Sequence, residues 1–564
     1  MFGVLLLLLQ LTLATASKTS KSFPVHRALQ FNLGDRSFGS RVSTLELKAS
    51  SNPGITQPKP SKTKGKKPRR LQPLNRKCIV VTMQEATKEL LEHLVDARRV
   101  GGLLIVIPEE TTVLEAGTLN NWKLLEEWML SRELKVPIYF TIESEQTNSI
   151  VNFVHSPGAA ASSDDYLLKT TVKPSKQIKT PTLQNIQGWL AGEAKDVDSE
   201  HLPTLAVMGH YDSFGVIPGL AKGGGSSAVA VLELARLFAK AYKKQKGAYN
   251  VMFVLTAGGH MNYAGARDWL EQLDVQLMDS IDFVVCLDDL QTTSQLYLHY
   301  SKNPNDATMK RITQSLQSET AKTGSIQLIP KRKKISLTQP QLAWQHEQFA
   351  MKRIVGVTLS SRAEPSLFAN THDLYRSPTA TVKDLSKVIT VIANGLANIV
   401  YPSRTVTEEV EREEAVDAEE VAAVKKNNKK KKKKTAATKK VNQVTMKVDP
   451  KYITTWTNYM RAHARVAPFM SHEHAVAIEK ALKSTVRETS IQKFVLEETA
   501  VQNFVFYDGV DGTMSAYLVK GIEFDIKMTI GVAVYLGAVW LYMLVLKDGW
   551  NGAKRQLLGK RKSL

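Results

Sequence analysis

The chain has very few cysteines and no glycosylation sequon. Only Cys78 and Cys286 occur among its 564 residues, too few for the disulfide framework of a small secreted protein. The sequence leaves open whether the two pair. Cys286 lies within the apolar run 283–287, where a buried thiol packed like a small apolar side chain is expected. A hydrophobic core, rather than a set of disulfides, must therefore stabilise the fold.

Acidic residues are absent from the two most basic stretches of the chain. Ten lysines lie between residues 425 and 440, and nine Lys or Arg residues lie between residues 59 and 77. These stretches account for nearly all of the net charge of +21, so the rest of the chain is close to neutral. A nucleic-acid-binding protein needs basic residues on a structured face or motif. We therefore expect no nucleic-acid partner.

Long apolar runs are confined to the two ends of the chain. Residues 1–16 combine a leucine-rich core with Ala14-Thr15-Ala16, a pattern typical of a cleaved signal peptide. The segment 527–547 has no charge between its terminal lysines and is long enough to cross a bilayer as a helix. The tail 548–564 is basic, which places it in the cytosol, and its end, 560–564, is typical of a retrieval signal for the endoplasmic reticulum. We expect a single-pass type I protein of the endoplasmic reticulum membrane with a luminal N-terminal domain.

Shifts in composition and periodicity divide the remaining sequence. Alternating strand and helix patterns predict two α/β units, and the larger should hold a doubly wound, mixed sheet. Its strands are expected at 204–208, 250–255, 283–287, 295–300 and 354–359, and its helices at 226–244, 306–319 and 382–399. The expected order of segments is a basic polar linker (17–77), a small α/β domain (78–175), the larger α/β domain (176–402), a charged low-complexity insertion (403–445) and a luminal helical region (446–526). A short strand is possible at 44–47 in the linker. Helices are expected at 454–466, 474–486 and 495–506 in the luminal region.

Two polar residues mark the end of the first strand of the larger domain. His210 and Asp212 are two positions apart, so their side chains point the same way, into the crevice where open α/β sheets hold ligands. This arrangement resembles the M28 aminopeptidase family. In that family the histidine binds zinc, and the aspartate orients it.

The same resemblance assigns the other positions of a two-zinc site. Gly223 stands where the family has the carboxylate that bridges the metals, and Gly259 stands where it has the general base. The remaining ligand positions fall on His260, Asp288 and, more loosely, His372. Glycine has no side chain and can fill neither role. The resemblance thus implies a vestigial metal site with no cofactor and no catalysis; a single zinc on His210, His260 and Asp288 is the alternative.

Taken as a whole, the chain resembles the nicastrin family, in which a degenerate M28-type ectodomain precedes one C-terminal span. The motifs that carry the resemblance are 210–216, 232–238, 258–265, 286–288, 343–347, 504–508 and 535–538. It implies a non-catalytic scaffold that meets the lipid bilayer and pairs with the Nodal modulator protein and a multi-spanning membrane protein. It further implies association with the Sec61 translocon and ribosome and a role in making multipass membrane proteins. Two other functions remain open, an active membrane-anchored zinc aminopeptidase and a luminal sorting or cargo receptor.

Overall fold

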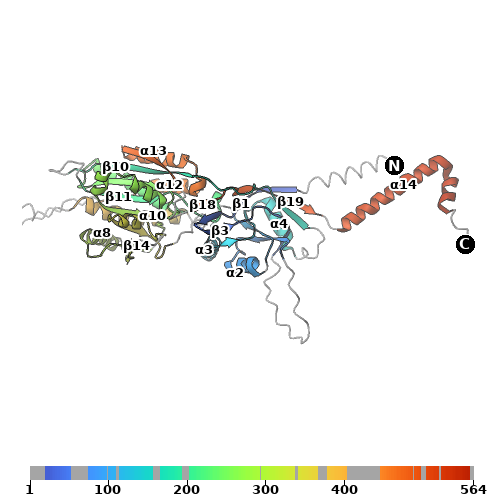
Figure 1. Ribbon diagram of the computed structural model, residues 1–564, viewed down its shortest axis with the longest axis horizontal. Coiled ribbons are helices and arrows are strands. Elements are labelled where there is room, and N and C mark those ends of the chain that lie inside the picture. The colour runs from blue at the N-terminus through green and yellow to red at the C-terminus, as the bar shows by residue number, and fades with distance from the viewer. Residues whose placement is uncertain are drawn as a thin grey trace, which may run out of the picture.

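Two folded domains lie next to each other, and a long helix extends beyond the smaller one (Figure 1). The structure is a computed structural model that describes residues 20–51, 74–97, 99–109, 113–156, 165–193, 202–291, 294–336, 341–365, 378–402, 445–486, 488–496, 504–519 and 522–558. Four of the expected features lie outside these residues. They are the signal peptide at 1–16, nearly all of the charged insertion at 403–445, His372, and the retrieval signal at 560–564.

The larger domain is built on an eight-stranded mixed sheet with the strand order β15-β14-β16-β13-β11-β12-β10-β17. Its central strands run parallel, and they are buried on both faces because helices cover both. These central strands are β12 (Asn250–Thr256), β11 (Thr204–His210), β13 (Ile281–Leu287) and β16 (Val355–Ser360). The outer strands are β10 (Thr182–Leu190), β17 (Glu488–Val495), β14 (Gln295–Tyr300) and β15 (Gln327–Arg332). The predicted α/β class and doubly wound mixed sheet are confirmed.

Helices cover the sheet on both sides, as the alternation of side chains along β11 requires. Leu205 and Val207 pack in the core beneath α5, whereas Ala206 and Met208 pack on the opposite face with Trp269 and Phe349. The first face is covered by α5 (Ser226–Tyr242), α8 (Ala307–Thr323), α10 (Pro378–Val400) and α12 (Pro450–Ala462). The second face is covered by α6 (Ala264–Glu271), α7 (Val275–Ser280) and α9 (His346–Met351), and α13 (Glu473–Thr485) packs on β10 and β17.

The smaller domain is a closed barrel with the strand order β1-β19-β9-β4-β5-β6-β8. Its strands are β1 (Ser20–Arg27), β19 (Asp511–Val519), β9 (Asp165–Thr170), β4 (Glu46–Ser50), β5 (Lys77–Thr82), β6 (Gly102–Ile107) and β8 (Ile138–Ile142). The helices α2 (Lys88–Glu92), α3 (Ala116–Leu130) and α4 (Glu145–His155) flank it. A four-stranded sheet of β18 (Phe504–Phe506), β2 (Gln30–Leu33), β3 (Arg36–Ser40) and β7 (Glu133–Leu134) lies beside the barrel. Cys78 is buried in the barrel and Cys286 in the larger sheet, and both are free thiols.

The expectation of a polar linker at 17–77 is wrong over residues 20–40, which form strands β1 to β3, whereas the possible short strand at 44–47 corresponds to β4 (Glu46–Ser50). Phe23 and Val25 of β1 are buried in the barrel core, but β1 finds its partner in β19, at the other end of the chain. Local sequence does not show such a long-range pairing, because the polar residues of a half-buried strand resemble those of a linker.

The region 446–526 is only partly helical, which corrects a second expectation. Helices α12 and α13 are present, but residues 495 and 504–506 of the helix expected at 495–506 lie in strands β17 and β18, and residues 497–503 are outside the described part of the chain. Strand β17 pairs along the whole of β10 at the edge of the larger sheet, and β19 pairs with β1 and β9 in the barrel. Both domains are therefore completed by the C-terminal part of the chain.

The two domains contact each other through backbone and buried polar groups. The Leu29 N–H donates to the Val216 carbonyl at 2.8 Å, and the Val216 N–H donates to Glu126 Oε1 of α3 at 3.0 Å. Glu126 is fully buried, so water does not compete for this carboxylate. These bonds fix the loop that follows β11 against the smaller domain.

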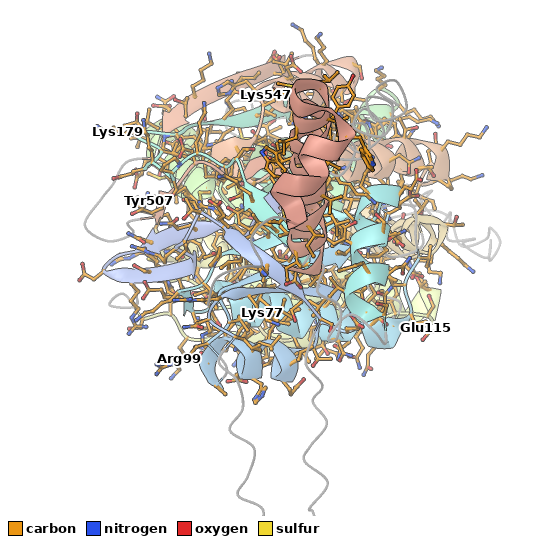
Figure 2. All side chains as sticks on the ribbon, turned by 90° about the vertical axis from the view of Figure 1, so that its right-hand side faces the viewer. Lys77, Arg99, Glu115, Lys179, Tyr507 and Lys547 are labelled. Carbon is orange, nitrogen blue, oxygen red and sulfur yellow. The ribbon has the colours of Figure 1, made fainter. Side chains whose placement is uncertain are left out.

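The long helix α14 (Ile522–Leu558) follows the barrel strand β19 almost directly. Its segment Met528–Lys547 has a mean hydropathy of 2.1 and is long and apolar enough to cross a membrane. The two domains leave this segment almost wholly uncovered, and Figure 2, viewed from the α14 side, shows the helix with Lys547 labelled. A change of direction at Gly549, where φ is 65°, follows the segment. The structure therefore agrees with one C-terminal span.

Candidate functional site

The carboxyl ends of the central strands bring together most of the residues singled out from the sequence. His210 ends β11, Gly259 and His260 lie in the turn after β12, and Asp288 follows β13. The side chains of His210, His260 and Asp288 are buried. The rings of His210 and His260 lie 5.2 Å apart, centroid to centroid, and almost perpendicular. These residues thus lie together at this edge of the sheet, and their buried side chains fill the space where a crevice was expected.

Gly259 lies directly against the His210 ring. A Cβ atom at residue 259 would lie 2.4 Å from His210 Cγ and 2.7 Å from its Cβ and Cδ2, well inside van der Waals contact. The Gly259 N–H donates to Asp212 Oδ1 at 2.9 Å, which draws the turn close to β11. Residue 259, where the resemblance to M28 peptidases led us to expect the position of the general base, therefore has no room for a side chain unless His210 or the turn moves.

Asp212 supports this turn by accepting a hydrogen bond from its backbone. Burial raises the pKa of the Asp212 carboxyl, while His210 and the backbone N–H groups of Gly259 and His260 act in the opposite direction. In the described part of the chain, Asp212 Oδ2 and His210 Nδ1 are buried atoms without a hydrogen-bond partner. Asp212 contacts the backbone of the turn, and its role here is to hold that turn in place.

A basic residue that the sequence analysis did not identify neutralises Asp288. Nη2 of Arg362 donates to Asp288 Oδ1 at 2.9 Å and to Oδ2 at 2.8 Å, and both side chains are largely buried. Burial alone would raise the pKa of Asp288, but Arg362 and His210 together hold it below its usual value. Arg362 follows β16, the parallel neighbour of β13. Its place after a strand of the same sheet is the signal that could have revealed it.

A second arginine, Arg465, holds the glycine-rich loop before α5. Nη2 of Arg465 donates to the carbonyl of Gly223 at 2.9 Å, and its Nε donates to the carbonyl of Tyr211 at 2.8 Å. Burial lowers the pKa of Arg465 to about 10, so the guanidinium stays charged at neutral pH. Further carbonyl acceptors of this guanidinium are Lys222, Met460 and His463.

These residues do not fit a pair of metal ions. Gly223 offers only a carbonyl that Arg465 already engages, and both oxygens of Asp288 are bonded to Arg362. Within the described ranges, no group of three or more His, Cys, Asp or Glu side chains is placed to hold an ion. Two fixed positive charges beside the crevice would also repel a divalent cation. His372, the remaining expected ligand, lies outside the described residues.

Comparison with known proteins relates the larger domain to M28 peptidases. The model of the family described as "Peptidase family M28" matches residues 185–387, which cover the central sheet and the crevice. The BOS complex subunit ncln of Danio rerio is 27% identical over 578 residues, covering 95% of this chain and 92% of the relative. The human BOS complex subunit NCLN is also 27% identical, covering 93% of this chain and 89% of the relative. The Caenorhabditis elegans protein named nicalin is 28% identical over half of this chain and 56% of its own length.

The chain is similar to the BOS complex subunits NCLN along nearly its whole length. Among solved structures, the gamma-secretase component nicastrin matches with a TM-score of 0.57, covering 88% of this chain and 99% of that one. The sequence identity to nicastrin is only 10%, so this likeness concerns the fold. This chain and nicastrin thus share a fold, and the expected resemblance to the nicastrin family is confirmed.

Proposed function

We propose that this chain is a non-catalytic scaffold subunit anchored in a membrane by α14. The contact of Arg362 Nη2 with both oxygens of Asp288 is the observation that carries the proposal. The guanidinium lies within hydrogen-bond distance of both carboxylate oxygens, so a divalent cation bound to Asp288 would lie beside a fixed positive charge that repels it. Arg362 supplies the positive charge that a metal would otherwise supply to Asp288.

We infer further that no aminopeptidase chemistry survives in the crevice. Deprotonation of a water by a positioned carboxylate contributes roughly 10²- to 10⁴-fold to such a reaction, and Gly259 cannot supply that carboxylate. Gly223 cannot bridge two ions. Both glycines are held through their backbone groups. Arg465 donates to the carbonyl of Gly223, and the N–H of Gly259 donates to Asp212.

The relatives suggest the context in which such a scaffold works. They are named as subunits of the BOS complex, so we propose that this chain also assembles with partners. The proposed partners are the Nodal modulator protein, a multi-spanning membrane protein, the Sec61 translocon and the ribosome, in the service of multipass membrane protein biogenesis. The proposed location is the endoplasmic reticulum membrane, with both folded domains in the lumen and the tail beyond α14 in the cytosol.

Metal analysis of the full-length protein tests the loss of catalysis. The protein is purified in mild detergent, its zinc is measured by mass spectrometry, and hydrolysis of aminoacyl reporters is assayed. We expect substoichiometric zinc and no hydrolysis, both unchanged in His210→Ala and in a control at the exposed His472, His472→Ala. Stoichiometric zinc that disappears only in His210→Ala would contradict the proposal and support the zinc aminopeptidase.

Co-purification tests the scaffold role separately. The tagged full-length chain is isolated from membranes in mild detergent, and the bound proteins are identified by mass spectrometry. We expect membrane proteins in amounts comparable to the chain itself. If the chain is recovered alone under conditions that preserve other membrane complexes, the scaffold proposal is wrong even where zinc is absent.

A further inference from the structure

A basic pocket lies at the edge of the larger sheet opposite the crevice, where β14 and β15 end and β16 begins. Its volume is about 330 Å³. Strands β11, β13 and β16 are parallel, so their carboxyl ends and the crevice lie at the other edge. The residues that line the pocket are Ser301, Lys302, Arg332, Lys334, Ile335, Ala350, Arg353, Ile354 and Gly356. No acidic residue is among them.

Four consecutive basic residues at the end of β15 point alternately to two sides of the strand. Those on one side form ion pairs, and those on the other side line the pocket. Lys331 and Lys333 point to one side, where Lys331 contacts Glu364 at 3.0 Å and Lys333 contacts Glu347 at 3.1 Å. Arg332 and Lys334 point to the other side, into the pocket, as a period of two requires. In the described parts of the chain, no carboxylate forms an ion pair with either of them.

Two further cations complete the pocket from other segments. Lys302 follows β14, and Arg353 lies in the turn after α9 with a left-handed φ of 65°. All four basic side chains are exposed, and among the described residues none of the four has an acidic partner. Like charges gathered around one hollow repel one another, and a bound anion would relieve that repulsion.

We propose that this pocket binds an acidic peptide segment of a protein partner. Ile335 and Ile354 add apolar surface for the stems of glutamate or aspartate side chains. The lining holds no aromatic ring on which a base could stack, which disfavours single-stranded nucleic acid. The pocket also belongs to the domain that lies away from α14, as the position of β14 in Figure 1 shows, which disfavours lipid headgroups of the anchoring membrane. The proposal does not depend on whether the crevice is catalytic.

Fluorescence anisotropy with the full-length protein in detergent tests this site. The probe is a labelled oligoglutamate peptide, and an oligoglutamine peptide of the same length is the neutral control. We expect saturable binding of the acidic peptide alone, weakened by added salt. The variant Arg332→Ser/Lys334→Ser should weaken it about tenfold, since it removes two exposed charge contacts. Lys480→Ser/Lys483→Ser on α13 removes the same charge from exposed positions elsewhere and should leave binding unchanged.

Three outcomes would overturn the proposal. The first is equal weakening in both double variants, which would show attraction to overall positive charge. The second is preferential binding of vesicles that contain phosphatidylserine, lost in the Arg332→Ser/Lys334→Ser variant. The third is that neither the full chain nor a variant that lacks residues 405–420 binds the acidic peptide. That variant excludes competition from within the chain, because seven glutamates lie between Glu408 and Glu420.

Discussion

At the scale of single residues, the crevice differs from a metal site in the positions of its glycines and arginines. Gly259 lets the His210 ring occupy the space over the turn. Arg362 and Arg465 place permanent positive charge beside Asp288 and Gly223. The charges are balanced and the space is filled without an ion. The fold can therefore keep the shape of a hydrolase sheet without an ion between these side chains.

Gly259→Ala tests how closely the crevice is packed. The added Cβ would lie 2.4 Å from His210 Cγ, so the ring or the turn must move, and we expect a loss of about 1–3 kcal/mol or more. Gly117→Ala in α3 is the matched control. Nothing lies within 4 Å of its Cβ position, and alanine favours the helix by up to about 1 kcal/mol. Thermal unfolding of the full-length protein followed by tryptophan fluorescence measures both. Equal midpoints for the two variants would show that the crevice is loosely packed.

His346 should make the larger domain sensitive to acid. Its ring is fully buried, with Nδ1 2.9 Å from Thr358 Oγ1 and Nε2 3.1 Å from Ser301 Oγ. Burial, with His299 and Lys333 nearby, lowers the pKa of His346 to about 3. In the unfolded chain the pKa is about 6.5, so below that pH the unfolded state binds more protons. The stability that neutral His346 contributes is complete above pH 6.5 and falls as the pH drops, by up to about 1.4 kcal/mol per unit.

The variant His346→Gln should reverse this behaviour in part. It should be less stable than the wild type at pH 7.5, because the buried hydrogen bonds change. Its stability should depend less on pH between 6.5 and 5, where the wild type loses stability. His472→Gln, at an exposed position, should keep the wild-type dependence. Denaturant unfolding at several pH values gives the comparison, and an unchanged slope in His346→Gln would contradict the assignment.

At the scale of secondary-structure elements, Arg465 joins the end of α12 to the loop before α5. The loop needs glycine, because Gly224 and Gly225 have φ values of 71° and 85°. It presents carbonyl groups to the buried guanidinium, and the Arg465 backbone also bonds to Ala221 and Ser213. One side chain from residue 465 thereby fixes a loop more than two hundred residues earlier in the chain.

Arg465→Met should release this loop. Methionine is similar in length but leaves the carbonyl of Gly223 and its neighbours buried without a donor, so we expect a loss of at least about 3 kcal/mol. Hydrogen exchange measured by mass spectrometry should rise across residues 221–225. Lys451→Met, an exposed change at the start of α12, should leave exchange in the loop unchanged. Unaltered protection of the loop in Arg465→Met would show that its backbone is held by other contacts.

The sequence predicts the strands of the larger sheet well but misses several outer elements. Strands β11, β12 and β13 are long apolar runs bounded by glycines and polar turns, and they end within two residues of the expected positions. Strands β1, β17 and β19 are polar on one face and pair with distant segments, so neither periodicity nor composition reveals them. Arg362 and Arg465 are hidden for a related reason. Their partners lie 74 and 242 residues away, and the motifs of the active enzymes do not include them.

At the scale of the whole molecule, the segments that follow the larger sheet complete both domains. Strand β17 covers the edge of β10, β18 extends the sheet of β2, and β19 lies between β1 and β9 in the barrel. Helix α14 follows β19 with only residues 520 and 521 between them. The apolar helix is therefore attached to the barrel, and the larger domain extends away from it (Figure 1).

Truncation distinguishes this discontinuous organisation from a chain of consecutive domains. A fragment that ends at residue 402 stops at the expected boundary of the larger domain, but it lacks β17, β18, β19 and Arg465. Strands β1, β9 and β10 would then expose unpaired edges, which favour aggregation. A fragment that ends at residue 520 keeps all of these pairings and loses only the apolar helix.

We expect the fragment that ends at residue 520 to be secreted as a monomer that unfolds cooperatively and does not bind membranes. The fragment that ends at residue 402 should aggregate or be degraded by limited proteolysis. Size-exclusion chromatography and thermal unfolding measure both. A monomeric, cooperatively unfolding fragment that ends at residue 402 would mean that β17 and β19 are additions to domains already complete. The C-terminal third would then serve only to reach the membrane, and the pairing of β1 with β19 would contribute little to stability.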